Sequence, residues 1–124
     1  MKDGKHVVLC IDDDPDFLMA VRAIIEPKGY AVVEAASAEE GLRAYKEARP
    51  DLVIVDLMME EVDAGTHFVK EIKALGETTP IYMLSSVGDD LSMTTDYTEL
   101  GLDGVLQKPV EPQMLLGILE RKLK

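Results

Sequence analysis

Short apolar runs alternate along the chain with longer stretches in which apolar residues recur at helical spacing. This alternation is typical of βα units wound around a parallel sheet. The first, third and fourth runs are apolar at nearly every residue, as expected of strands that helices cover on both faces. The predicted strands are His6–Ile11, Ala31–Glu34, Leu52–Asp56, Ile81–Leu84 and Gly104–Leu106. The pattern therefore predicts a doubly wound α/β fold.

Capping residues mark the first two helices. Asp14–Pro15 supplies an N-cap and a proline at the first helical position, and Pro27 should stop that helix. Ser37 followed by Glu40 forms a capping box for the second helix, which Pro50 ends. Both helices are therefore bounded by local sequence signals.

The sequence signals for the three later helices differ in strength. Thr66 is expected to cap the third, residues 89–100 form a Thr-rich fourth with weak helix propensity, and the last begins near Glu111. The apolar faces of the third and last helices are predicted to be Phe68, Ile72 and Leu75, and Leu115, Ile118 and Leu119, respectively.

Length and charge narrow the class of protein. The 124 residues have room for one domain, residues 1–124, and 47% of them are hydrophobic. A net charge of −11 disfavours direct binding to nucleic acid. No apolar run approaches the roughly 20 residues of a membrane span, and the opening lacks a secretory pattern. We expect a cytoplasmic protein in which the single cysteine, Cys10, is a buried structural thiol.

Polar residues follow the predicted strands at the points where these end. The first strand leads into Asp12–Asp14, the third ends in Asp56, the fourth leads into Ser85–Ser86, and the fifth into Gln107–Pro109. Ligands of open parallel sheets bind outside the carboxyl ends of the strands. These side chains are therefore expected to share one site.

The acidic residues of this edge suggest a metal site. Carboxylates brought together repel one another unless a cation neutralises them, and oxygen ligands favour a hard ion such as Mg²⁺. Asp13 and Asp56 are candidates for direct ligation, and Asp12 for ligation through water. The alternative for this acidic run is helix capping and solvated charge, which is the favoured interpretation for Asp14.

Asp56 is also a candidate nucleophile, because a carboxylate at the exit of a buried strand can form an acyl phosphate. Lys108 can offer positive charge and Ser85 a hydroxyl donor to phosphate oxygens. The lesser alternative for Asp56 is a cap for the following loop. Taken singly, Lys108 and Ser85 are more often a surface lysine and a capping serine. Taken together at neighbouring strand ends, they predict a phosphate cradle.

The chain resembles response regulator receiver domains of two-component signalling over its whole length. VVLCIDDDPDFL is similar to the acidic opening of that family, LVIVDLMM to its phosphorylation strand, MLSS to its hydroxyl position and LQKPVEP to its lysine–proline pair. The resemblance implies a flavodoxin-like (βα)₅ three-layer sandwich with strand order 2-1-3-4-5.

The same resemblance assigns roles. It implies Mg²⁺-dependent (or Mn²⁺-dependent) transfer from the phosphohistidine of a sensor histidine kinase or phosphotransfer protein to Asp56. The implied metal site uses Asp12, Asp13, Asp56 and the Met58 backbone carbonyl, while Ser85 and Lys108 contact the phosphoryl group. Such a protein is a signalling switch that catalyses its own phosphorylation and dephosphorylation, and it acts on a downstream protein target. The resemblance leaves open whether phosphorylation makes the protein dimerise.

Two departures from the family concern the relay of the signal. In DLMMEEVDAG, Glu60 replaces the usual proline and Gly65 comes one residue late, which predicts a longer, more acidic loop. Val105 stands where the family often has a switching aromatic. The usual aromatic relay is therefore not expected in the same form.

Two other functions compete with the phosphorylated switch. One is a degenerate receiver that binds partners without phosphorylation. The other is a small-molecule phosphatase or phosphotransferase with an aspartyl-phosphate intermediate. Such enzymes commonly place a second acid two residues after the nucleophile, where this chain has Met58. Every position that phosphorylation chemistry requires in this family carries a suitable residue here, which favours the phosphorylated switch.

Overall fold

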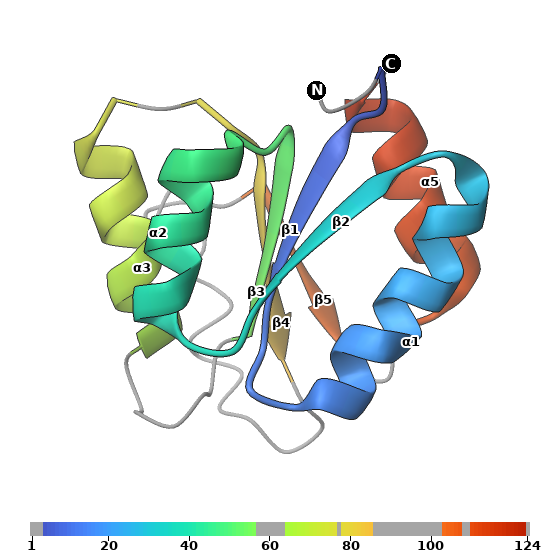
Figure 1. Ribbon diagram of the computed structural model, residues 1–124, viewed down its shortest axis with the longest axis horizontal. Helices are drawn as coiled ribbons and strands as arrows, with labels where there is room; N and C mark the ends of the chain where they lie inside the picture. Colours follow the sequence, from blue (N-terminus) through green and yellow to red (C-terminus); the bar gives the residue numbers. More distant parts are fainter. Residues whose placement is uncertain (1–3, 57–63, 77, 86–102, 108–109, 124) are drawn as a thin grey trace.

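The sheet is fully parallel, with strand order β2-β1-β3-β4-β5. The computed structural model describes residues 4–56, 64–76, 78–85, 103–107 and 110–123 (Figure 1). The strands are β1 (Val7–Ile11), β2 (Ala31–Ala35), β3 (Leu52–Asp56), β4 (Ile81–Ser85) and β5 (Gly104–Gln107). Every predicted strand is present, with its ends shifted by one residue at most. The predicted fold class and strand order are confirmed.

Helices cover both faces of this sheet. Figure 1 shows α1 and α5 on one side of the sheet and α2 and α3 on the other. Their bounds are α1 (Pro15–Ile25), α2 (Ala38–Ala48), α3 (Ala64–Ala74) and α5 (Pro112–Lys122), and a 3₁₀ turn, Glu26–Lys28, follows α1. The fourth predicted helix, residues 89–100, lies outside the described residues. The arrangement is the predicted three-layer sandwich.

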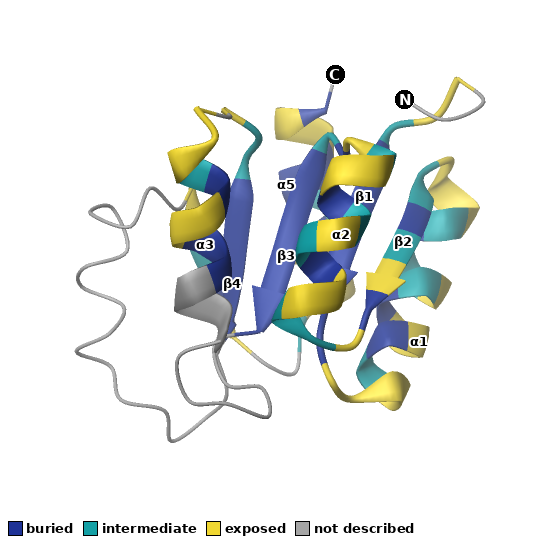
Figure 2. Ribbon diagram, turned by 60° about the vertical axis from the view of Figure 1, so that its left-hand side comes forward, coloured by how far each residue is buried: buried dark blue, intermediate teal, exposed yellow. Residues whose placement is uncertain are grey.

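Alternate residues of the central strands build two separate cores. Val8 and Cys10 of β1 pack in the cluster that contains residues of α1 and α5, whereas Leu9 and Ile11 pack in the cluster with α2 and α3. All five residues of β1 and of β3 are buried, as the dark strands in Figure 2 show. Cys10 is fully buried, as predicted. The sheet edge that carries the acidic residues is thus anchored from both sides.

The helix starts follow the predicted caps. The Asp14 carboxylate accepts a hydrogen bond from the Asp16 backbone N–H at 3.0 Å. At α2, the Ser37 hydroxyl accepts from the Glu40 N–H at 3.1 Å, and the Glu40 carboxylate accepts from the Ala36 N–H at 2.9 Å. The capping box is therefore present, with its return bond one residue before Ser37.

Two predictions about α3 are wrong. The helix begins at Ala64, so Thr66 lies within its first turn and is not its N-cap. Leu75 follows the last helical residue and is 52% exposed, while Phe68 and Ile72 are buried as predicted. Leu75 has the sequence spacing of the buried face, but the helix ends one residue before it. Its side chain therefore does not join Phe68 and Ile72 in the core.

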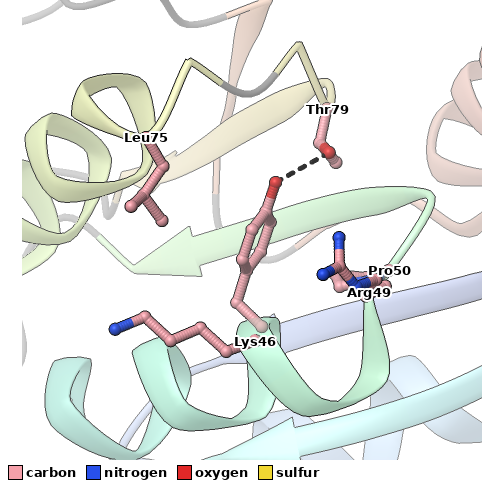
Figure 3. A pocket seen from close by; sticks show the side chains of 6 residues that line it. Lys46, Arg49, Pro50, Leu75 and Thr79 are labelled. Atoms are coloured by element: carbon pink, nitrogen blue, oxygen red, sulfur yellow. Dashed lines mark hydrogen bonds between the residues drawn. The ribbon is translucent and has the colours of Figure 1, made fainter.

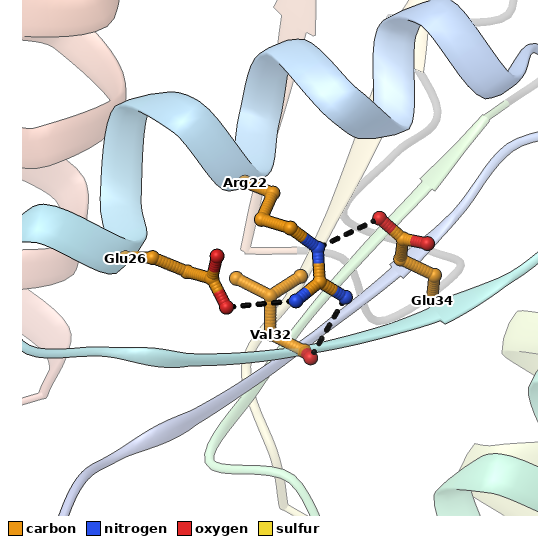
Figure 4. A network of polar contacts seen from close by, with 4 residues as sticks. All are labelled: Arg22, Glu26, Val32 and Glu34. Carbon is orange, nitrogen blue, oxygen red and sulfur yellow. Dashed lines mark hydrogen bonds and ion pairs between the residues drawn. The ribbon is translucent and has the colours of Figure 1, made fainter.

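Arg22 ties α1 to the edge strand β2 (Figure 4). Its Nε donates to Glu34 at 3.1 Å, one terminal nitrogen donates to Glu26 at 2.7 Å, and the other donates to the Val32 carbonyl at 3.4 Å. The hydrogen bond to Glu34 is the main reason why the pKa of Arg22 lies above its usual value. The contacts hold α1, which follows the acidic run, against the sheet.

No helix within the described ranges is long and apolar enough to cross a membrane.

Candidate functional site

The register of the sheet brings two acidic segments together. In the parallel pair of β1 and β3, Ile11 lies opposite Val55. The next residue along each strand is an aspartate, Asp12 after Ile11 and Asp56 after Val55. Because the strands run side by side in the same direction, both aspartates leave the sheet at the same edge.

A turn fixes the backbone around Asp12. Its N–H donates to the Ala35 carbonyl at 3.0 Å, which extends the pairing of β1 and β2 by one residue. Its Oδ1 accepts from the Asp14 N–H at 2.9 Å, which closes an Asx turn that leads into α1. Asp12 is fully buried, whereas Asp13 is exposed. Asp14 has the predicted role of helix cap.

Three carboxylates converge at this point. One oxygen each of Asp12, Asp13 and Asp56 lies within 4.8 Å of the other two, and Asp56 is only 4% exposed. Two like charges at such a separation repel by about 3.5 kcal/mol at an effective dielectric constant of 20. A divalent cation would offset this repulsion, and an all-oxygen donor set suits Mg²⁺ or another hard ion. The three residues therefore fit a metal, as their positions in the sequence predicted.

The other predicted site residues are described only in part. Ser85 is the last residue of β4 and pairs with Gln107 of β5, so its backbone lies at the same edge as Asp56. The Ser85 side chain, Met58 and Lys108 lie outside what the structure describes, as do residues 57–63 of the lengthened loop. Val105 is half-buried in β5, opposite Met83.

A family model agrees with the topology and the acidic cluster. The model of the response regulator receiver domain matches residues 8–120. This chain belongs to the response regulator receiver domain family. The receiver domain of this family is a signalling module, and this chain shares its sheet order and the acidic cluster at the carboxyl edge.

Individual proteins support the same assignment of this receiver domain. The chemotaxis protein CheY of Bacillus subtilis (strain 168) is 33% identical over 119 residues, which make up 95% of this chain and 98% of CheY. The transcriptional regulatory protein GlrR of Escherichia coli (strain K12) is 33% identical over 117 residues, but these are only 26% of GlrR. The structure of the chemotaxis response regulator CheY4 of Vibrio cholerae has a TM-score of 0.83 and 32% identity, and it covers 96% of this chain and 99% of CheY4.

Sequence reasoning missed polar residues at the opposite end of the sheet. The Asp51 carboxylate accepts from the Val7 N–H at 2.7 Å and lies 3.7 Å from His6 Nδ1. It thereby satisfies the first backbone donor of β1. The signal in the sequence is an acidic residue directly before a buried strand.

Proposed function

We propose that this receiver domain, residues 1–124, accepts a phosphoryl group on Asp56 and thereby switches a protein-interaction surface. The observation that carries the proposal is the convergence of Asp12, Asp13 and the buried Asp56, whose carboxylate oxygens lie within 4.8 Å of one another. Membership of the receiver family supports the assignment. The phosphoryl donor we propose is a sensor histidine kinase or a phosphotransfer protein, and the receiver of the signal is a downstream protein.

In the proposed transfer, one carboxylate acts as the nucleophile. A carboxylate oxygen of Asp56 attacks the phosphorus of phosphohistidine, the O–P bond forms and the P–N bond breaks. The leaving imidazole nitrogen keeps the electron pair and takes up a proton. We assign Ser85 the role of hydrogen-bond donor and Lys108 the role of cation toward the phosphoryl oxygens. Later attack by water releases phosphate and restores the carboxylate.

Asp12 and Asp13, with Asp56 and the Met58 backbone carbonyl, would hold Mg²⁺ or Mn²⁺. The bound ion supplies the positive charge that offsets the carboxylates and the incoming phosphoryl oxygens. The Asx turn through the Asp14 N–H holds the Asp12 carboxylate in place, so this ligand is oriented before the ion arrives. The exposed position of Asp13 gives the ion a route from solvent.

The direct experiment is incubation with acetyl phosphate and Mg²⁺, followed by intact-protein mass spectrometry. The wild type should gain the mass of one phosphoryl group, and Asp56→Asn should gain none. Asp14→Asn is the matched control, because it removes an adjacent charge but keeps a side chain that caps α1 well. It should be phosphorylated like the wild type.

Absence of a mass gain with any phosphodonor would refute the proposal and favour a receiver that binds its partners without phosphorylation. Rapid turnover of p-nitrophenyl phosphate would favour a small-molecule phosphatase instead.

A further inference from the structure

A pocket lies at the end of the sheet opposite the acidic cluster. It has a volume of about 490 Å³ and is lined by Tyr45, Lys46, Arg49, Pro50, Leu75 and Thr79. Pro50 precedes β3 and Thr79 precedes β4, so the pocket belongs to the amino ends of these strands, whereas Asp56 is at a carboxyl end. Figure 3 shows Lys46 and Arg49 on the side of α2, and Leu75 and Thr79 on the side of α3 and the loop after it. A small molecule fits in a pocket of this size.

The pocket holds two cations that the rest of the described chain leaves unpaired. Lys46 and Arg49 are exposed, and neither forms an ion pair with an acidic residue in the described ranges. Arg22, by contrast, binds two glutamates, and Lys122 lies 3.3 Å from Asp103. The two residues lie three positions apart in the sequence, and both line the pocket. They give the pocket positive charge for a ligand.

The backbone of Arg49 is in an unfavourable conformation. With φ 48° and ψ 64° it is left-handed, and among the described residues it is the one non-glycine with positive φ. Glycine or asparagine is the usual residue at such a helix end, and the following Pro50 restricts Arg49 further. The conformation caps α2 through the backbone, since the Arg49 N–H donates to the Tyr45 carbonyl at 3.0 Å. Glycine would make that hydrogen bond with less strain, so capping does not explain why an arginine occupies this position.

The remaining walls suit the body of an organic ligand. Leu75 is 52% exposed, Pro50 is buried, and the Tyr45 ring is buried beside them. The Tyr45 hydroxyl lies 2.9 Å from the Thr79 hydroxyl, so two hydroxyl groups meet at the pocket wall. An apolar surface next to two cations and two hydroxyls is the composition expected of a site for an amphipathic anion.

We propose that this pocket binds a small organic oxyanion, a phosphate or carboxylate attached to an apolar body. Arg49 and Lys46 hold the charged group, Arg49 with its planar guanidinium fork, and Leu75 and Pro50 contact the apolar part. The site is separate from Asp56, because it lies at the other end of the sheet.

The test is a titration of ¹⁵N-labelled protein followed by amide chemical shifts. The probes are phenylphosphonate, which has no transferable phosphoryl group, benzoate, and neutral benzyl alcohol. Either anion should shift the amides of Lys46, Arg49 and Thr79 more than those of the acidic cluster. Tighter binding of phenylphosphonate assigns a phosphate ligand, and tighter binding of benzoate assigns a carboxylate. Absence of shifts at these amides with either anion, or equal binding of benzyl alcohol, would overturn the proposal.

Variants separate the role of Arg49 from its effect on the fold. Arg49→Gly should weaken binding of the preferred anion by roughly tenfold, since a hydrogen bond to a charged group is lost. Its melting temperature should rise, because glycine adopts the left-handed conformation without strain. The matched control is Arg43→Gln, which removes one exposed positive charge from the same helix outside the pocket and should leave binding within twofold. Equal weakening in both variants, or unchanged affinity in Arg49→Gly, would refute a specific site.

Discussion

Gly41 of α2 lies against the side chain of Ile11 of β1, and Gly41→Ala tests that packing. A methyl group built at Gly41 would lie 2.5 Å from Ile11 Cδ1, 2.9 Å from Cγ1 and 3.3 Å from Cγ2. Carbon atoms in a packed core are normally about 3.5 to 4.0 Å apart. Ile11 is completely buried, so its side chain has little room to give way.

Two opposing effects set the change in the free energy of unfolding that Gly41→Ala causes. Alanine in place of glycine inside a helix normally stabilises a protein by roughly 0.5 to 1 kcal/mol. Forcing an extra methyl group into a filled core costs about 1 to 3 kcal/mol. The overlap with three atoms of one buried side chain places this site in the upper half of that range, so we expect a net loss of about 1 to 2 kcal/mol in the free energy of unfolding.

The assay is urea unfolding of four proteins, namely the wild type, Gly41→Ala, Ile11→Val and the double variant. Ile11→Val alone should cost about 0.5 to 1.5 kcal/mol. Because valine lacks the Cδ1 atom that the new methyl group meets first, the double variant should be more stable than the sum of the single changes by about 1 kcal/mol.

A stabilising Gly41→Ala, as helix propensity alone predicts, would refute the reasoning. Strict additivity in the double variant would show that any loss arises somewhere other than at Ile11. Affinity for Mg²⁺ serves as a further check. The backbone of Ile11 is paired with Ala35 on one side and Val55 on the other, so the strain should fall on side chains and α2, and the affinity should stay within twofold.

Three further predictions concern other parts of the molecule. Burial, aided by the Glu120 charge, raises the pKa of Tyr30 above its usual 10.0, so the folded state holds this proton more tightly than the unfolded chain. The contribution of Tyr30 to stability should be fully present below pH 10 and lost as the pH rises through the raised pKa, and urea unfolding should find a shallower decline in Tyr30→Phe. Asp51→Ala should cost about 1 to 3 kcal/mol because the Val7 N–H loses its acceptor, while Asp51→Asn, which keeps one, should cost less; equal losses would contradict this. Mg²⁺ at a hundredfold excess over its dissociation constant should stabilise the protein by about 2.7 kcal/mol in calorimetry, and the same concentration should stabilise Asp13→Asn less.

Features that depend on neighbouring residues could be predicted from the sequence. Strand positions followed from apolar runs, and the caps at Asp14 and Ser37 followed from residue type and spacing. The meeting of Asp12 with Asp56 could also be predicted, because parallel strands end at a common edge whatever their exact register. These features need only local pattern and one general rule of sheet geometry.

Features that depend on where an element stops could not be predicted in the same way. Leu75 continues the spacing of Phe68 and Ile72, but its N–H donates to the Ile72 carbonyl outside the helix and Gly76 follows with φ 79°. A change of one residue in the helix end turns a core position into a pocket wall. The conformation of Arg49 could not be predicted for the same reason, since Pro50 in the sequence indicates only that the helix ends. The left-handed backbone that aims Arg49 at the pocket is a consequence of how α2 joins β3. The pocket at the amino ends of β3 and β4 is therefore lined by residues at the ends of α2 and α3, and their meeting could not be predicted from the sequence.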